Sequence, residues 1–122
     1  MHEVAHIGVV VKDIDKSVNF YTTVLDCQRE ESYQDDRIRL EFIKSGQQTI
    51  ELIQYKQDPA GSRGFGFVDH IAFLVQDIDR EIARLQQFNV PLLFDQPKLT
   101  GNKRIMFFTG PDGERLEFVQ KV

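Results

Sequence analysis

The sequence predicts an α+β fold of two tandem βαβββ units, and three observations lead to this prediction. The chain repeats itself, each copy opens with an apolar run of strand length, and each run is followed by an acidic residue that starts a helical pattern. The length of 122 residues suits one domain, residues 1–122. Ten Phe among 41% apolar residues supply enough material for a buried core without disulfides.

The internal repeat has two parts. Residues 6–15 (HIGVVVKDID) match residues 70–79 (HIAFLVQDID) at an offset of 64, and residues 49–54 (TIELIQ) match residues 115–120 (RLEFVQ) at an offset of 66. Chance explains one such match more easily than two in the same order at nearly one spacing. We therefore predict a first repeat over about 1–58, a second over about 67–122, and a Gly-rich connector over 59–66.

Each repeat has the same predicted elements. The apolar runs Val4–Val11 and Val68–Val75 predict buried strands, and Asp13 and Asp77 are placed to cap the helices that follow. One apolar stripe is expected on each helix, formed by Val18, Tyr21 and Leu25 in the first and by Ile78, Ile82 and Leu85 in the second. Three shorter strands complete each repeat, at Cys27–Tyr33, Arg37–Lys44 and Gln48–Tyr55, then at Leu92–Asp95, Lys103–Phe108 and Arg115–Lys121. Gly46 and residues 110–113 supply turns.

The bulk composition argues against several classes of protein. Charged residues make up 28% of the chain, the net charge is −4, and no basic stretch of the kind expected in a nucleic-acid-binding protein is visible. No apolar run approaches the length of a membrane span, and the first residues do not read as a signal segment. Cys27 is the single cysteine, which excludes an internal disulfide. We expect a cytoplasmic protein that acts on a small molecule, without nucleic-acid or membrane partners.

Four residues at equivalent positions of the repeats are candidate metal ligands: His6, Glu51, His70 and Glu117. Singly, a His in an apolar strand or a Glu on an alternating strand is unremarkable. Two similar units usually pack about a pseudo-twofold axis, which would bring the equivalent positions together around one cleft. Two imidazoles and two carboxylates suit one divalent ion, Zn²⁺, Ni²⁺, Co²⁺, Fe²⁺ or Mn²⁺, with positions left for water or substrate. The expected fold is therefore a curved mixed sheet around a metal-binding cleft.

Other motifs have simpler explanations. Residues 2–6 spell H-E-x-x-H, but this segment reads as a strand, in which the two His would lie about 13 Å apart and could not share a zinc ion. The glycines at 61–66 do not form a nucleotide-binding loop. Cys27 lacks an evident base, and the acids near each helix start lack the rest of a calcium loop.

The motifs together resemble the vicinal-oxygen-chelate superfamily, which includes glyoxalase I, methylmalonyl-CoA epimerase, fosfomycin-resistance thiol transferases and bleomycin-resistance proteins. The resemblance covers nearly the whole chain and rests on residues 6–13, 20–25, 50–52, 69–73 and 110–118. It is closest to glyoxalase I, whose ligand set of His or Gln, Glu, His and Glu falls on His6, Glu51, His70 and Glu117. The epimerases have Gln where Glu51 stands, the fosfomycin enzymes would not need Glu51, and the bleomycin-binding members have no metal set.

The resemblance implies a metal-dependent lyase or isomerase that moves a proton through an enediolate of a small 1,2-dioxygenated substrate, such as a 2-oxoaldehyde thiol adduct. Glu51 or Glu117 would leave the ion and carry the proton, and which of them does so stays open. Alternatives are an acyl-CoA epimerase, a fosfomycin-type thiol transferase and a non-catalytic ligand-sequestering protein. By analogy the chain would form a homodimer.

Three positions differ from the family pattern. Asp26 stands where a Gly is usual, and Asp tolerates the left-handed backbone better than most residues. Val10 and Tyr55 occupy the places of an Arg and an Asn that glutathione-dependent members carry. We therefore expect another thiol adduct, or a different 1,2-dioxygenated compound, in place of a glutathione adduct.

Overall fold

The computed structural model describes residues 2–57 and 64–122, which form two compact units. The first unit is His6–Asp69, and the second is Met1–Ala5 with His70–Val122. Each unit contains one helix and a mixed four-stranded sheet, so the predicted α+β class with a repeated βαβββ order is confirmed.

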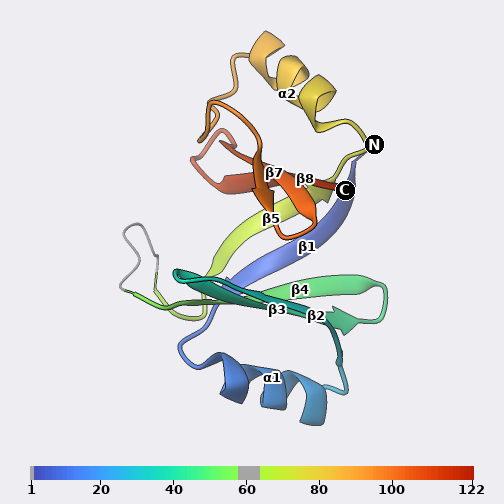
Figure 1. Ribbon diagram of the computed structural model, residues 1–122, viewed down its shortest axis with the longest axis vertical. Coiled ribbons are helices and arrows are strands. Elements are labelled where there is room, and N and C mark those ends of the chain that lie inside the picture. The colour runs from blue at the N-terminus through green and yellow to red at the C-terminus, as the bar shows by residue number, and fades with distance from the viewer. Residues whose placement is uncertain (1, 58–63) are drawn as a thin grey trace. The chain divides into compact units, whose positions relative to one another are not determined.

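The sheet of the first unit is built from strands β1 (Glu3–Val10), β2 (Gln28–Gln34), β3 (Ile38–Ser45) and β4 (Gln48–Tyr55) in the order β2-β3-β4-β1. Strands β1 and β4 run parallel, and the other neighbours are antiparallel. Helix α1 (Ile14–Thr23) connects β1 to β2 and lies along one face of this sheet (Figure 1). Gly46 has a positive φ in the tight turn between β3 and β4, as the sequence predicted for a turn residue.

Helix α1 holds the core of the first unit. Its buried Ile14 and Val18 pack with Ile43 and Leu52 of the sheet. Because side chains alternate along a strand, the neighbours of Leu52 point to the opposite face. We call the face of each sheet that lies away from its own helix the ligand face.

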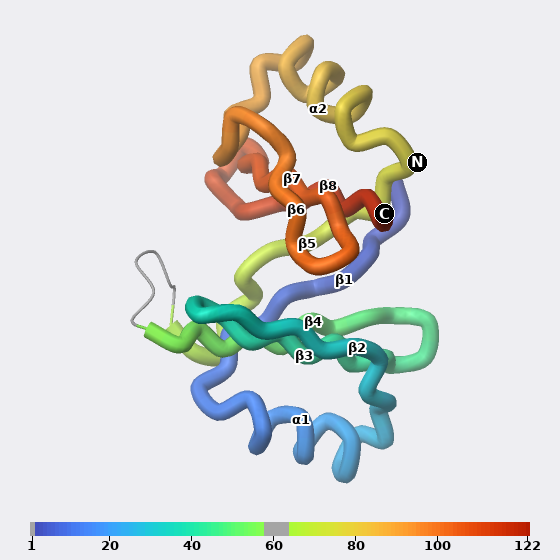
Figure 2. Tube along the Cα trace, viewed as in Figure 1, coloured from blue at the N-terminus to red at the C-terminus, as the bar shows by residue number. Residues whose placement is uncertain are grey.

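The second unit repeats this plan with strands β5 (Val68–Leu74), β6 (Lys98–Thr100), β7 (Lys103–Thr109) and β8 (Arg115–Lys121) in the order β5-β8-β7-β6. Helix α2 (Ile78–Gln87) follows β5, and the tube in Figure 2 shows it above the strands of its own unit. Strands β5 and β8 run parallel, like β1 and β4. The core between α2 and the sheet is formed by Ile78, Ile82, Met106, Phe108 and Phe118.

The predicted strand at Leu92–Asp95 is wrong. Leu92 makes one isolated bridge to Phe108, and the second strand of this unit is instead β6, which pairs with β7 across a two-residue Gly101-Asn102 turn. Leu92 and Phe94 pack against the α2 core without joining a ladder. Their apolar character therefore reports burial in a loop and not strand pairing.

The predicted helix starts are confirmed. The Asp13 carboxylate accepts a hydrogen bond from the backbone N–H of Lys16, and Asp77 does the same for Arg80. The stripe of the second helix is also confirmed, with Ile78 and Ile82 buried and Leu85 packed against them. In the first helix the stripe ends earlier than predicted. Leu25 is 54% exposed because α1 ends at Thr23.

Two further predictions concern the backbone. Asp26 adopts a φ of 55°, so it takes the left-handed conformation that the sequence allowed for it. The predicted connector over 59–66 falls partly outside the described residues; within them, Gly66 donates a backbone hydrogen bond to Val10. No helix in the part of the chain that the structure describes is long and apolar enough to cross a membrane.

Candidate metal centre

The first candidate pair, His6 and Glu51, lies on neighbouring parallel strands of the first unit. Gly8 of β1 is in register with Glu51 of β4, and His6 precedes Gly8 by two residues, so both side chains occupy the ligand face. The His6 Nε2 atom lies 3.6 Å from Glu51 Oε1. His6 and Glu51 are only 5% and 6% exposed, which makes this a buried imidazole–carboxylate pair.

The second unit contains the equivalent pair, His70 and Glu117. Ala72 of β5 is in register with Glu117 of β8, in the same relation that Gly8 has to Glu51. The His70 Nε2 atom lies 3.1 Å from Glu117 Oε1, and both residues are 4% exposed. The structure thus brings the four predicted residues together as two pairs, each within one unit.

An aromatic ring orients each imidazole. The rings of His6 and Phe42 meet edge to face with centroids 5.6 Å apart, and those of His70 and Phe107 meet in the same way at 5.2 Å. Phe42 stands opposite Glu51 on β3, and Phe107 stands opposite Glu117 on β7. Phe42 was not predicted to have this role, although its offset of 65 from Phe107 lies between the two offsets of the repeat.

The donor atoms of each pair are spaced as two ligands of one ion. Bonds of about 2.1 Å place neighbouring ligand atoms roughly 3.0–3.4 Å apart in octahedral or tetrahedral coordination. The separations of 3.6 and 3.1 Å between His Nε2 and Glu Oε1 are near this range. Imidazole nitrogen and carboxylate oxygen are donors for borderline divalent metals such as zinc, nickel and cobalt. Each pair therefore fits half of the predicted ligand set.

The H-E-x-x-H segment does not form a zinc-protease site. Its residues enter strand β1 and not a helix, as predicted. His2 Nε2 lies 2.6 Å from Glu81 Oε2, and the His2 ring stacks on Phe118 at 5.5 Å between centroids. His2 therefore packs against the helix side of the second unit, because Phe118 belongs to the α2 core.

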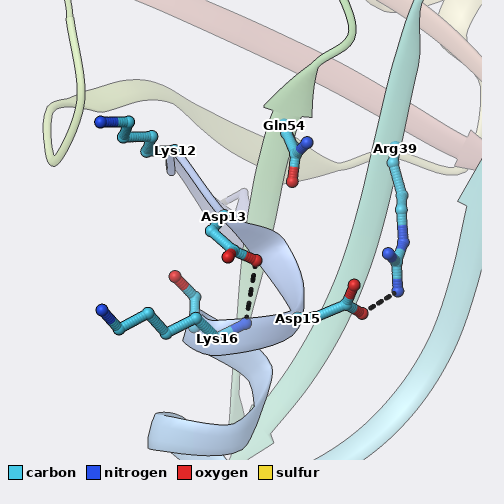
Figure 3. A pocket seen from close by; sticks show the side chains of 7 residues that line it. Lys12, Asp13, Asp15, Lys16, Arg39 and Gln54 are labelled. Carbon is cyan, nitrogen blue, oxygen red and sulfur yellow. Dashed lines mark hydrogen bonds and ion pairs between the residues drawn. The ribbon is translucent and has the colours of Figure 1, made fainter.

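A polar pocket lies at the start of α1, on the helix side of the first sheet (Figure 3). Its lining includes two lysines, and several of its polar groups serve the fold: Arg39 Nη2 lies 2.9 Å from Asp15 Oδ1, and Asp13 caps the helix. The Arg39 hydrogen bond and charge lower the pKa of Asp15. Gln54 from the pocket lining accepts a hydrogen bond from the N–H of Ile14. We therefore assign this pocket a structural role.

Glu41 is a buried acid that the sequence analysis did not single out. It is 2% exposed on β3, with Arg29 Nη2 and Ser32 Oγ each 2.7 Å from its Oε1 atom. Burial raises the pKa of Glu41, but the hydrogen bonds from Ser32 and Arg29 outweigh it, and the net pKa is lowered. This carboxylate is neutralised by neighbouring cations on the helix side of the sheet, so it is not a further candidate metal ligand.

Two βαβββ units, each with a buried His on its first strand and a buried Glu on its last, define the class of protein. The family model of the Glyoxalase/Bleomycin resistance protein/Dioxygenase superfamily matches residues 3–118. The chain belongs to this superfamily, as the sequence motifs predicted. This superfamily includes members that bind a divalent metal, and most of its members are enzymes.

Relatives by sequence include proteins with and without an assigned activity. The chain is 33% identical to the uncharacterized protein YwbC of Bacillus subtilis, with 95% of each chain covered. It is 28% identical to the metallothiol transferase FosB of Staphylococcus epidermidis, covering 93% of this chain and 78% of FosB. It is also 28% identical to lactoylglutathione lyase of Neisseria meningitidis, covering 95% of this chain and 88% of that enzyme.

Solved structures share the fold. A hypothetical protein of Bacillus halodurans, BH1468, superposes with a TM-score of 0.89 at 23% identity and covers 99% of this chain and 95% of its own. Methylmalonyl-CoA epimerase of Mycobacterium tuberculosis superposes with a TM-score of 0.86 at 22% identity, covering 98% and 87%.

Proposed function

We propose that this protein is a metal-dependent lyase or isomerase of the glyoxalase type, acting on a small 1,2-dioxygenated substrate such as a 2-oxoaldehyde thiol adduct. In this proposal His6, Glu51, His70 and Glu117 together hold one divalent ion. When bound, such an ion supplies Lewis-acid polarisation of two neighbouring substrate oxygens.

The observation that carries this proposal is the duplication of the His–Glu pair. In each unit a buried imidazole and a buried carboxylate approach within 3.6 or 3.1 Å on two parallel strands that have the same register. Burying an acid is costly unless a cation or hydrogen-bond donors compensate it. A fold that buries such a pair twice at equivalent places is best explained by a ligand that both pairs serve.

The carboxylates supply the proton chemistry. Two imidazoles and Glu117 suffice to hold an ion, so Glu51 is the ligand most easily released to act as a base. A carboxylate that leaves a cation becomes more basic. Glu51 stands on the ligand face directly opposite Phe42, at the edge of an apolar surface. That surface is formed by Leu40, Phe42 and Ile53 together with the partly buried Tyr33, Ile38 and Tyr55. Glu51 would thus take a proton from a carbon next to the substrate oxygens and return it to the neighbouring carbon.

A thiol transferase of the fosfomycin-resistance type is the second candidate. The FosB relative supports it, since it is matched over 93% of this chain. The buried Glu51 beside His6 supports the proton-transfer reaction instead, because a transferase needs no second carboxylate as a base. An acyl-CoA epimerase would share the proton transfer, and a non-catalytic ligand-sequestering protein would need neither the base nor the metal.

Elemental analysis of the purified protein tests the proposed site. We expect about one Zn, Ni, Co, Fe or Mn per binding site, and loss of that metal in His6→Ala and in His70→Ala. His2→Ala is the matched control, because it removes an imidazole that contacts Glu81 and Phe118 outside the pairs. Unchanged metal content in His70→Ala would show that the ligand set is wrong. Turnover of methylglyoxal adducts with several thiols, compared with fosfomycin and acyl-CoA substrates, then separates the candidate reactions.

We further propose that the chain acts as a homodimer in the cytoplasm. The superfamily supports the dimer, since its members often associate in this way. The single, buried Cys27 supports a reducing compartment, because the chain has no cysteine pair to oxidise.

A further inference from the structure

The ligand face of the second unit is cationic at positions where the first unit is not. Strands β7 and β8 place Lys103, Arg115 and Lys121 on the same face as Glu117, which is the one acidic residue in these two strands. Their counterparts in the first unit, at the same spacing from Phe42 and Glu51, are Ile38, Thr49 and Tyr55. The repeat thus preserves the His–Glu pair but not the charges around it.

Arg115 is the cation nearest to the His70–Glu117 pair along the strands. It precedes Glu117 by two residues on β8, so its Cα lies about 7 Å away and its side chain points to the same face. Its guanidinium carbon lies 5.9 Å from the centre of the Phe107 ring, and that ring also meets the His70 imidazole. Arg115 is half-buried, and the contact with Phe107 restrains its head group near the pair.

Two further cations, Lys103 and Lys121, lie on the same face as Arg115. Lys103 and Lys121 stand directly opposite each other in the β7–β8 register. Like charges in that relation destabilise a sheet. This arrangement gathers three cations on one face, and a guanidinium is the side chain best shaped to bind an oxyanion through two hydrogen bonds.

We propose that Arg115 binds a carboxylate group of the substrate, beside the two oxygens that the metal would engage. This inference rests on the proposed function, because it places the anion relative to that metal. It narrows the substrate class to small acids with vicinal oxygens. It also places the anionic end of the substrate beside Arg115 on the second unit.

The test compares two kinds of hydroxamate, which chelate metals through two neighbouring oxygens. The acidic probes are the monohydroxamates of malonic, succinic and glutaric acid, and each is paired with a chain-matched neutral hydroxamate. Calorimetry measures binding to the wild type, Arg115→Met and Arg115→Lys, while elemental analysis measures the metal in each. Arg104→Met is the matched control: it removes the same charge from β7 on the helix side, where Arg104 pairs with Asp79 at 3.2 Å.

We expect the wild type to prefer at least one acidic probe over its neutral partner by about tenfold or more. Arg115→Met should lose that preference at unchanged metal content, Arg115→Lys should keep part of it, and Arg104→Met should keep all of it. A metal-loaded wild type without an acidic preference, or an Arg115→Met variant that retains it, overturns the role of Arg115 and leaves the proposed function standing. A wild type that holds no metal and binds neither kind of probe overturns both.

Discussion

Replacing Gln54 with Met tests how the fold holds the His6–Glu51 pair. The Gln54 Oε1 atom accepts a hydrogen bond of 2.7 Å from the backbone N–H of Ile14, the first residue of α1. Gln54 follows Glu51 on β4, and α1 follows the strand that carries His6, so this bond ties together the two chain segments that present the pair. The second unit repeats it: Gln120 Oε1 accepts from the N–H of Ile78 at 2.9 Å.

The expected cost follows from burial. Ile14 is 1% exposed, so in Gln54→Met its backbone N–H loses its acceptor at a largely buried position. An unsatisfied buried donor costs about 1–3 kcal/mol, and Met keeps the side-chain length, so little packing is lost. We expect the free energy of unfolding to fall by that amount, which for a domain of this size lowers the Tm by roughly 3–10 °C.

Denaturant titration followed by circular dichroism measures the effect, with Gln54→Glu as the matched control. The carboxylate keeps an acceptor oxygen and places a negative charge at a helix N-terminus, which is favourable. Gln54→Glu should therefore stay within about 0.5 kcal/mol of the wild type or exceed it. The reasoning is refuted if Gln54→Met unfolds at the wild-type midpoint, or if both variants lose the same stability. Gln120→Met should behave like Gln54→Met.

Three further predictions concern acid stability, catalysis and assembly. The pKa of Glu41 is lowered in the folded state, so its contribution to stability is present above the unfolded value of 4.5 and is lost as the pH falls through the folded value. The free energy of unfolding of Glu41→Gln, measured between pH 3 and 7, should accordingly be lower than that of the wild type at neutral pH and should change less as the pH falls. Glu51→Gln should keep the fold and lose about 10²-fold or more in turnover of a thiol adduct, and full activity would move the base to Glu117. Light scattering at micromolar concentration should give twice the chain mass of 14.2 kDa, and a particle of 14.2 kDa would exclude the dimer.

Most of the fold could be predicted from local patterns. Strands β4 and β8 begin and end where the sequence predicted, because a glycine turn precedes each of them and side chains alternate along them. The errors arise where an apolar residue is not part of a regular element. Leu25 was assigned to a helix that ends at Thr23, and Leu92 packs on a core while making a single bridge. The periodicity of apolar residues indicates which side chains are buried, but it does not indicate which strands pair with each other.

The candidate ligands could be predicted because duplication marks them, whereas their supporting residues could not. Phe42 and Gln54 act through contacts with residues of other strands or of the helix, and such contacts depend on a register that a single sequence does not display. Gln54 and Gln120 were visible as matching letters in the repeat. Only the hydrogen bonds to Ile14 and Ile78 explain why both halves need the same amide.

The comparison of the two units separates chemistry from specificity. Both units keep the residues that position a donor pair. These are the His, the Glu, the aromatic ring that contacts the imidazole, and the Gln side chain that bonds to the start of the helix. In the proposed function both donor pairs serve one ion, and identical surroundings of the two pairs would not distinguish the two ends of a substrate. The positions at which the halves differ must therefore provide any preference, and Arg115 in place of Thr49 is the difference nearest to a donor pair that adds a half-buried charge. In a duplicated fold of this kind, the residues that break the repeat are the first place to look for the substrate.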